Sequence, residues 1–256
     1  MIKMVVENIK ISETAYLRTL TFEQENNDRP RPAILICPGG GYAHVSPRES
    51  DPIALQFAGI GYHTFVLKYT VPPTGKYDAL KEASDAMCII RDNAEKRCID
   101  PDKIAVCGFS AGGHLAGSLG TKWHEDYLNA NGKNKPNAMI LSYPVISSDE
   151  KIYHGGSFIN LMGEGADYSE MSLENCVSDK TPPTFLWHTV SDTCVPVENS
   201  LRFANALQEN KIPFEMHIYP EGPHGLAVAP DLPHVATWVE LCKQWLTMQF
   251  GDATFK

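Results

Sequence analysis

The chain has 256 residues, of which 43% are hydrophobic and 21% are charged, a composition typical of globular proteins rather than disordered or fibrous ones. A chain of this length can bury roughly three quarters of its unfolded surface, which is enough for a single domain with one sizeable core. The formal net charge is -9, from 22 Lys and Arg against 31 Asp and Glu, and no basic run exceeds two residues. The sequence therefore lacks the clusters of basic residues that bind a phosphate backbone, and we expect no nucleic-acid partner.

The amino-terminal residues carry charges every few positions, and the longest apolar runs elsewhere, such as 33–37, have the length of a strand. We therefore expect neither a secretion signal nor a membrane-spanning segment. The seven cysteines lack any Cys-x-x-Cys pair, and several of them lie within apolar segments. Cysteines in this pattern fit a reducing compartment, so the sequence predicts a cytoplasmic protein. The sequence leaves the oligomeric state open, a homo-oligomer included.

Apolar, β-branched runs alternate with segments of helical period from residue 33 onward, as in a mostly parallel sheet with crossover helices. The sequence thus predicts an α/β fold, a three-layer sandwich around an eight-stranded sheet. The predicted strands are 3–11, 15–22, 33–37, 62–69, 103–107, 138–143, 184–189 and 214–219. The first two alternate polar and apolar residues and should form a half-exposed antiparallel pair at one edge, whereas 33–37 and 103–107 should be buried on both faces.

Helical periodicity predicts a packing helix over 77–97, where apolar residues recur at steps of three and four. Two further helices, at about 197–210 and 234–249, should close the chain. Residues 146–181, rich in Ser, Gly, Glu and Asp, interrupt the regular alternation and contain one short helical stretch near 158–162. We expect them to form a small insertion over the functional site, within a single domain of 1–256, because no linker divides the chain.

A Gly-x-Ser-x-Gly motif occupies residues 108–112, directly after a predicted strand and before a segment of helical character. In this setting the motif forms a nucleophile elbow. The sharp turn requires residues without a Cβ where the strand and helix backbones nearly touch, which accounts for Gly108 and Gly112. We therefore predict Ser110 as a nucleophile. The N–H group of Ala111, at the start of a helix, should stabilise a developing oxyanion.

Three consecutive glycines follow the strand 33–37 and Pro38. The second oxyanion donor of such a site comes from the loop after the third strand, often within a His-Gly-Gly-Gly motif, and here Pro38 replaces the histidine. Gly40 and Gly41 are our candidates for this donor, with a flexible turn as the alternative reading. No His or Cys cluster has the spacing of metal ligands, so we expect no metal and no cofactor.

The base that activates the serine should be a histidine, because the charge of histidine changes near neutral pH. His224 lies in a turn-rich loop between the last predicted strand and the last helix. The histidines that we expect to be structural or on the surface are His63, His114, His124, His217 and His234. The orienting carboxylate should lie between serine and histidine in chain order, and Asp192 follows the strand 184–189 on such a loop. Glu198 and Asp179 are weaker candidates, and Asp192 could instead cap the helix near 197.

The segments PGGGY, GFSAGGHLAG, SDTCVPVENS and GPHG together resemble the small acetyl esterase group of α/β-hydrolases, often described as acetylxylan esterase-like, over about 33–245. The resemblance implies an α/β-hydrolase fold with Ser110, Asp192 and His224 as the triad, and with the glycine loop and Ala111 as the oxyanion hole. Arg48-Glu49 and Lys68-Tyr69 also lie where such proteins carry segments of similar character, and the sequence assigns them no role. The lack of the His-Gly-Gly-Gly form argues against the hormone-sensitive lipase branch. The GxSAGG and HG elements also resemble prolyl-oligopeptidase-like peptidases, whose propeller domain has no counterpart here.

These residues predict a serine esterase that works through an acyl-enzyme intermediate. The insertion is short and lacks long apolar helices, so the predicted small-molecule substrate is a short acyl chain on a polar alcohol such as a sugar, a step that rests mainly on the resemblance. An amidase or peptidase would use the same triad, and a non-catalytic binding protein on this fold is the second alternative. Aromatic residues that could shape a substrate pocket, with core packing as the preferred alternative, are Tyr42, Phe109, Tyr143, Phe158 and Trp187.

Overall fold

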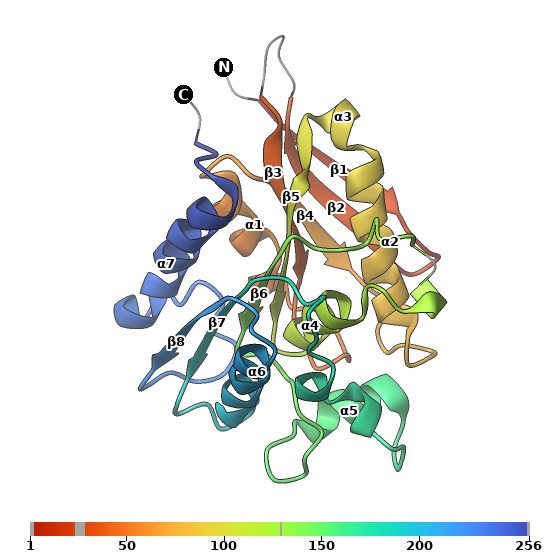
Figure 1. The fold of residues 1–256 in the computed structure, drawn as a ribbon, viewed down its shortest axis with the longest axis vertical. Helices are drawn as coiled ribbons and strands as arrows, with labels where there is room; N and C mark the ends of the chain where they lie inside the picture. The colour runs from red at the N-terminus through yellow and green to blue at the C-terminus, as the bar shows by residue number, and fades with distance from the viewer. Residues whose placement is uncertain (1–2, 24–28, 129, 255–256) are drawn as a thin grey trace.

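An eight-stranded sheet forms the centre of the computed structural model, which describes residues 3–23, 29–128 and 130–254 (Figure 1). The strands are β1 (Met4–Lys10), β2 (Tyr16–Phe22), β3 (Arg31–Cys37), β4 (His63–Lys68), β5 (Ile99–Phe109), β6 (Ala138–Ser142), β7 (Thr184–Thr189) and β8 (Phe214–Tyr219). Their order in the sheet is β1-β2-β4-β3-β5-β6-β7-β8. β2 is antiparallel to both of its neighbours, and the remaining six strands, β3 to β8, are parallel to one another. The predicted strand count and the antiparallel edge pair are therefore confirmed.

β5 is longer than the predicted run 103–107. It begins at Ile99, which pairs with Arg31 of β3, and it reaches Phe109. The added residues Asp100 and Pro101 have low strand propensity, but pairing with β3 and a register shift between the two strands extend β5 through them. Tertiary pairing therefore decides where this strand begins.

The helices are α1 (Asp51–Ala58), α2 (Asp78–Asp92), α3 (Ala94–Arg97), α4 (Ala111–Lys122), α5 (Gly155–Met162), α6 (Glu198–Glu209) and α7 (Pro233–Phe250). Short 3₁₀ helices occupy Pro47–Glu49, Asp126–Leu128, Ser169–Met171 and Leu173–Asn175. The prediction of one continuous helix over 77–97 is wrong, because α2 ends before Asn93. Asn93 leaves the helical conformation, with φ -99° and ψ 12°, and its backbone and side-chain N–H groups both donate to the carbonyl of Ile89, at 3.2 and 2.8 Å. These bonds cap the end of α2 before the short helix α3 begins.

The helices form two outer layers around the sheet (Figure 1). α2, α4 and α6 pack on one face, and α1 and α7 pack on the other. Within β3, Ala33 and Leu35 belong to the first of these cores, while Ile34 and Ile36 belong to the second. Because successive strand residues point to opposite faces, the continuous apolar run of β3 is buried on both sides, as predicted.

Residues 146–181 lie within the connection from β6 to β7, and they carry α5 beyond the lower end of the sheet in Figure 1. The predicted short helix near 158–162 corresponds to the second half of α5. Among the described residues, no helix is long and apolar enough to cross a membrane.

The turn between β5 and α4 brings three backbone segments into contact. A Cβ on Gly108 would lie 2.1 Å from the carbonyl oxygen of Gly112. A Cβ on Gly112 would lie 2.1 Å from the carbonyl oxygen of Cys37 and 2.3 Å from that of Pro38. No side chain fits at either position, so the packing of α4 against the ends of β3 and β5 requires both glycines.

We expect Gly112→Ala to lower the free energy of unfolding by about 3 kcal/mol or to prevent folding, because the added methyl group meets backbone oxygens of a packed turn. Urea denaturation followed by circular dichroism measures the change. Gly59→Ala is the matched control, since a Cβ there would meet backbone oxygens at 3.4 and 3.5 Å, an ordinary contact. Equal stability of the two variants would contradict the packing role of Gly112.

Candidate active site

Three side chains that are far apart in the sequence form a hydrogen-bonded chain at the carboxyl end of the sheet. Ser110 lies between β5 and α4, Asp192 follows β7, and His224 follows β8. His224 Nε2 lies 2.7 Å from Ser110 Oγ, and His224 Nδ1 lies 2.6 Å from Asp192 Oδ2. The weaker candidate carboxylates, Asp179 and Glu198, are exposed and take no part in this chain. The structure thus brings together the three predicted side chains in the order serine, histidine, aspartate.

The backbone of Ser110 adopts a conformation that is rare for residues with a side chain, with φ 54° and ψ -121°. Its N–H group donates to the carbonyl of Ser142 at 3.0 Å, and its own carbonyl accepts from the N–H group of Val145 at 3.0 Å. Such a conformation persists where the surroundings enforce it. Here the bonds on both sides of Ser110 hold the strained turn that directs Oγ toward His224.

Both carboxylate oxygens of Asp192 have donors. Oδ1 accepts from the N–H groups of Cys194 at 2.9 Å and Val195 at 3.0 Å, while Oδ2 faces His224. Burial by itself raises the pKa of Asp192, but hydrogen bonds from His188 and His224 and the charge of His224 outweigh it and hold the pKa well below its ordinary value. Asp192 is therefore ionised at neutral pH, so it can fix the tautomer of His224 and stabilise its protonated form.

His188 is a fully buried residue of β7 that the sequence analysis did not single out. Its Nε2 lies 2.9 Å from the carbonyl oxygen of Val195, and since a carbonyl only accepts, Nε2 carries the proton. Nδ1 then accepts from the hydroxyl of Ser200 at 2.8 Å. The same Nε2 lies 3.4 Å from Asp192 Oδ2, so His188 supplies a further donor beside the carboxylate. No sequence spacing signals this contact, because it depends on how the loop after β7 folds back.

The glycine loop after β3 passes directly beside the serine. A Cβ on Gly39 would lie 3.0 Å from the Cβ of Ser110. Gly40 and Gly41 have φ values of 125° and 64°, which residues with side chains rarely adopt. The carbonyl of Gly41 accepts from the amide of Asn160 in α5 at 2.8 Å, so residues 146–181 are hydrogen-bonded to this loop.

Free backbone donors lie on this loop and at the start of α4. In the residues that the structure describes, the N–H groups of Gly40, Gly41 and Ala111 donate to no protein acceptor, whereas the N–H group of Gly39 donates to Glu49 Oε2 at 2.8 Å. The arrangement leaves the predicted donors available to an oxygen that carries negative charge.

A buried carboxylate, Glu49, connects the glycine loop to the loop that carries His224. Glu49 Oε2 accepts from Gly39, and Oε1 accepts from the hydroxyl of Tyr143 at 2.6 Å. The Tyr143 oxygen in turn accepts from the N–H group of Ala227 at 2.9 Å. The ring of Tyr143 also packs against that of His224, with centroids 5.0 Å apart. One buried network therefore sets the glycine loop and the histidine loop relative to each other.

Two of the predicted pocket residues, Tyr42 and Phe109, are 1% and 0% exposed. The ring of Phe109 packs against Trp238 of α7, with centroids 6.0 Å apart. The hydroxyl of Tyr42 lies 2.8 Å from His114 Nδ1. Both side chains belong to the core, which favours the packing alternative over contact with a substrate.

His114 bridges the glycine loop and the insertion. Its Nδ1 faces Tyr42, and its Nε2 lies 2.9 Å from the carbonyl oxygen of Met171. Burial lowers the pKa of His114 to about 4, so the imidazole is neutral at pH 7. This agrees with the expectation that His114 is structural rather than the base beside Ser110.

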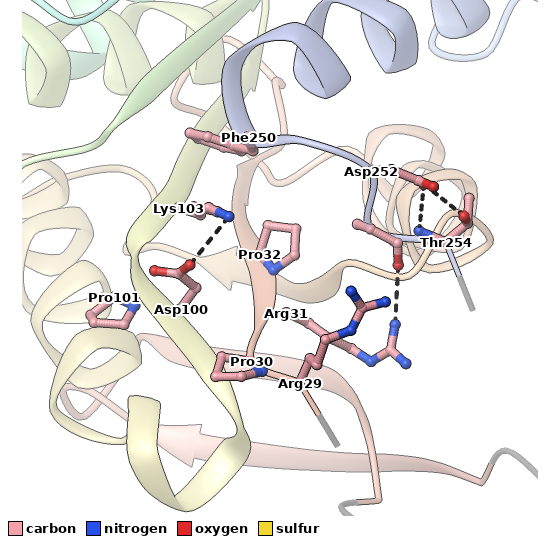
Figure 2. A pocket seen from close by; sticks show the side chains of 11 residues that line it. Arg29, Pro30, Arg31, Pro32, Asp100, Pro101, Lys103, Phe250, Asp252 and Thr254 are labelled. Carbon is pink, nitrogen blue, oxygen red and sulfur yellow. Dashed lines mark hydrogen bonds and ion pairs between the residues drawn. The ribbon is translucent and has the colours of Figure 1, made fainter. Parts of the chain in front are cut away.

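A cavity of about 600 Å³ lies at the opposite end of the sheet, where β3 and β5 begin (Figure 2). Asp100 and Lys103 form an ion pair at 3.4 Å in its wall, and the guanidinium of Arg31 donates to the carbonyl of Ala253 at 3.1 Å. None of the predicted site residues lines this cavity, so it is separate from the site around Ser110.

Tyr143→Phe should lower the free energy of unfolding by about 3 kcal/mol, because it keeps the ring but leaves Oε1 of buried Glu49 and the N–H group of Ala227 without the partner that the hydroxyl provides. Urea denaturation measures the loss. The control is Tyr219→Phe, which removes one hydroxyl contact, to Thr237 at 3.1 Å, and should cost about 1 kcal/mol. A loss for Tyr143→Phe no larger than that of the control would contradict the role of the network.

Comparison with known proteins relates the chain to a large hydrolase family. The model of the prolyl oligopeptidase family matches residues 77–252. The chain is 41% identical over 219 residues to endo-1,4-beta-xylanase B of Butyrivibrio fibrisolvens, a match that covers 80% of this chain and 34% of that protein. It is 34% identical over 205 residues to acetylxylan esterase of Xylanibacter ruminicola, covering 75% of this chain and 40% of that protein. The chain thus spans less than half the length of both relatives.

Among solved structures, an acetyl ester-xyloside bifunctional hydrolase from Caldicellulosiruptor lactoaceticus superposes with a TM-score of 0.83 at 41% sequence identity. The match covers 92% of this chain and 89% of that chain. The family model covers more than half of the chain, and the similarity to this structure extends over nearly all of both chains. The chain therefore belongs to the prolyl oligopeptidase family and has the α/β-hydrolase fold, with acetyl esterase-like proteins among its relatives.

Proposed function

We propose that the protein is a serine carboxylic-ester hydrolase that acts on acetyl and other short-chain esters of polar alcohols, acetylated sugars included. The observation that carries this proposal is the hydrogen-bonded chain Ser110, His224, Asp192 beside the free N–H groups of Gly40 and Ala111. A nucleophile, a base with an ionised partner and oxyanion donors are the components that acyl transfer requires.

In the first half of the proposed reaction, Ser110 Oγ attacks the ester carbonyl carbon while His224 Nε2 takes the hydroxyl proton. Asp192 stabilises the imidazolium that forms. The negative charge on the carbonyl oxygen is met by the N–H group of Ala111 and by one from the glycine loop, Gly40 or Gly41. The tetrahedral intermediate then collapses, His224 gives its proton to the leaving alcohol oxygen, and an acyl-enzyme remains.

In the second half, His224 takes a proton from water, whose oxygen attacks the acyl carbon. The second tetrahedral intermediate breaks the bond to Ser110 Oγ, which regains its proton from His224. The acid is released, and no cofactor takes part in the proposed cycle.

Two observations support short acyl groups on polar alcohols. The side chains of α5 and its start that lie against the glycine loop are polar: His154, Ser157 and Asn160. Two relatives are described as an acetylxylan esterase and an acetyl ester-xyloside bifunctional hydrolase. Polar neighbours of the reacting carbonyl are suited to an alcohol with hydroxyl groups and offer little apolar surface to a long acyl chain.

A peptidase or amidase is the second candidate, because the matching family is that of prolyl oligopeptidase and amide cleavage would use the same triad. A protein that only binds its ligand is a weaker alternative, because it would have no need for three catalytic side chains held at hydrogen-bonding distance.

Replacing the proposed nucleophile tests the function directly. We expect Ser110→Ala to lower kcat for p-nitrophenyl acetate by on the order of a thousandfold or more, as removal of a triad nucleophile does. The matched control is Ser118→Ala, a buried serine on the same helix, which should retain the wild-type rate. Equal rates for wild type and Ser110→Ala would exclude Ser110 as the nucleophile and favour the binding protein.

The relative rates on different substrates separate an esterase from a peptidase or amidase. We expect p-nitrophenyl acetate to be hydrolysed faster than p-nitrophenyl octanoate, since polar side chains lie over the glycine loop. Aminoacyl p-nitroanilides should be cleaved more slowly than the acetate by on the order of a hundredfold or more, compared as kcat/KM. Preference for the octanoate would contradict the short-chain assignment, and preference for the anilides would support the peptidase.

A further inference from the structure

The insertion brings a histidine to the glycine loop. His154 directly precedes α5, and its Cε1 lies 3.9 Å from the position that a Cβ on Gly41 would occupy. Ser157 Oγ lies at the same distance from that position. Asn160 holds this end of α5 in place through its bond to the carbonyl of Gly41. The half-buried imidazole of His154 therefore lies beside the loop that supplies the proposed oxyanion donors.

The local hydrogen bonds determine the tautomer of His154. Its Nδ1 accepts from the backbone N–H group of Ser157 at 3.2 Å and lies 2.8 Å from the hydroxyl of the same residue, which makes His154 the N-cap of α5. Because a backbone N–H group can only donate, Nδ1 carries no proton, and in the neutral ring the proton is on Nε2. Within the described part of the chain Nε2 has no hydrogen-bond partner. The cap thus leaves one N–H donor of the ring available.

The surroundings of His154 favour the neutral ring that this cap requires. Burial lowers the pKa of His154, and the nearby His224 lowers it further, while Asp192 acts in the opposite direction. Since Nδ1 is occupied and Nε2 is protonated, His154 can donate a hydrogen bond but is not placed to accept a proton as a second base. At neutral pH the ring therefore acts as a hydrogen-bond donor with a fixed orientation.

We propose that the Nε2–H group of His154 donates a hydrogen bond to an oxygen on the alcohol portion of the ester, and so selects alcohols that carry a hydroxyl or ether oxygen next to the ester linkage. This inference rests on the proposed esterase function. A donor already oriented by a helix cap loses little conformational entropy when a substrate binds. An alcohol without such an oxygen would leave the donor desolvated and unpaired, which disfavours its binding in the transition state.

The test uses two esters that differ by one hydroxyl group, cyclohexyl acetate and the monoacetate of trans-cyclohexane-1,2-diol. Wild type should prefer the diol ester in kcat/KM by on the order of tenfold, the effect of one well-formed hydrogen bond. His154→Asn retains an N-cap, because the asparagine oxygen accepts from the N–H group of Ser157, but its shorter side chain removes the ring donor. We expect this variant to bring the ratio of the two kcat/KM values down to about one.

Controls separate specificity from damage to the fold. Ser118→Ala should keep the wild-type ratio, and the thermal midpoint of His154→Asn should lie close to that of wild type. If His154→Asn lowers kcat/KM for both esters equally, or if wild type shows no preference, the inference is overturned while the esterase function stands. If wild type hydrolyses neither ester nor p-nitrophenyl acetate, the proposed function fails, and the inference fails with it.

Discussion

The close approach of three backbone segments at the turn between β5 and α4 is the constraint on which the rest of the site depends. Gly108 and Gly112 allow the ends of β3 and β5 to meet the start of α4 without a side chain between them. This contact forces Ser110 into its unusual backbone conformation and brings the glycine loop beside it. The same turn therefore positions both the proposed nucleophile and the proposed oxyanion donors.

Two buried carboxylates near this turn have different hydrogen-bond partners and therefore different effects. Asp192 faces His224 and is held ionised by donors on both oxygens, so it favours a charged imidazole. Glu49 accepts instead from the N–H group of Gly39 and the hydroxyl of Tyr143. A buried charge is tolerated only when its hydrogen bonds are satisfied, and here those bonds tie separate loops together. The relative position of His224 and the proposed oxyanion donors thus depends on a network that contains neither.

The insertion completes the site from the other side. Asn160 bonds to the glycine loop, and His114 links that loop to Met171, so the segment after β6 is attached to the same backbone that binds the oxyanion in the proposed mechanism. His154 caps α5, the helix that carries Asn160, and its Nε2–H group is the proposed donor to the alcohol portion of the ester. In the proposed mechanism, a segment that both supports the loop and borders it can tune substrate choice without altering Ser110, His224 or Asp192.

The sequence by itself determined the fold class, the eight strands, the elbow and the three side chains that meet at it, because each of these leaves a local signal. Periodicity marks strands and helices, and a serine between two glycines after a strand marks the turn. Asp192 and His224 could be chosen since both follow strands whose carboxyl ends meet at one edge of the sheet. By contrast, the end of α2 at Asp92 and the start of β5 depended on the capping bonds of Asn93 and on pairing with β3, which periodicity does not report.

Only the tertiary structure decided the supporting contacts. Glu49 and Tyr143 are 94 residues apart, and His188 meets Asp192 only because the loop after β7 folds back. Tyr42 and Phe109 are aromatic residues next to the motifs of the site, yet the direction of their side chains buries them in the core. Residue type states what a side chain can donate, accept or bury, but hydrogen bonds act over about 3 Å and along defined directions. Which partners come within that reach is determined by packing between distant segments, and no local pattern encodes it.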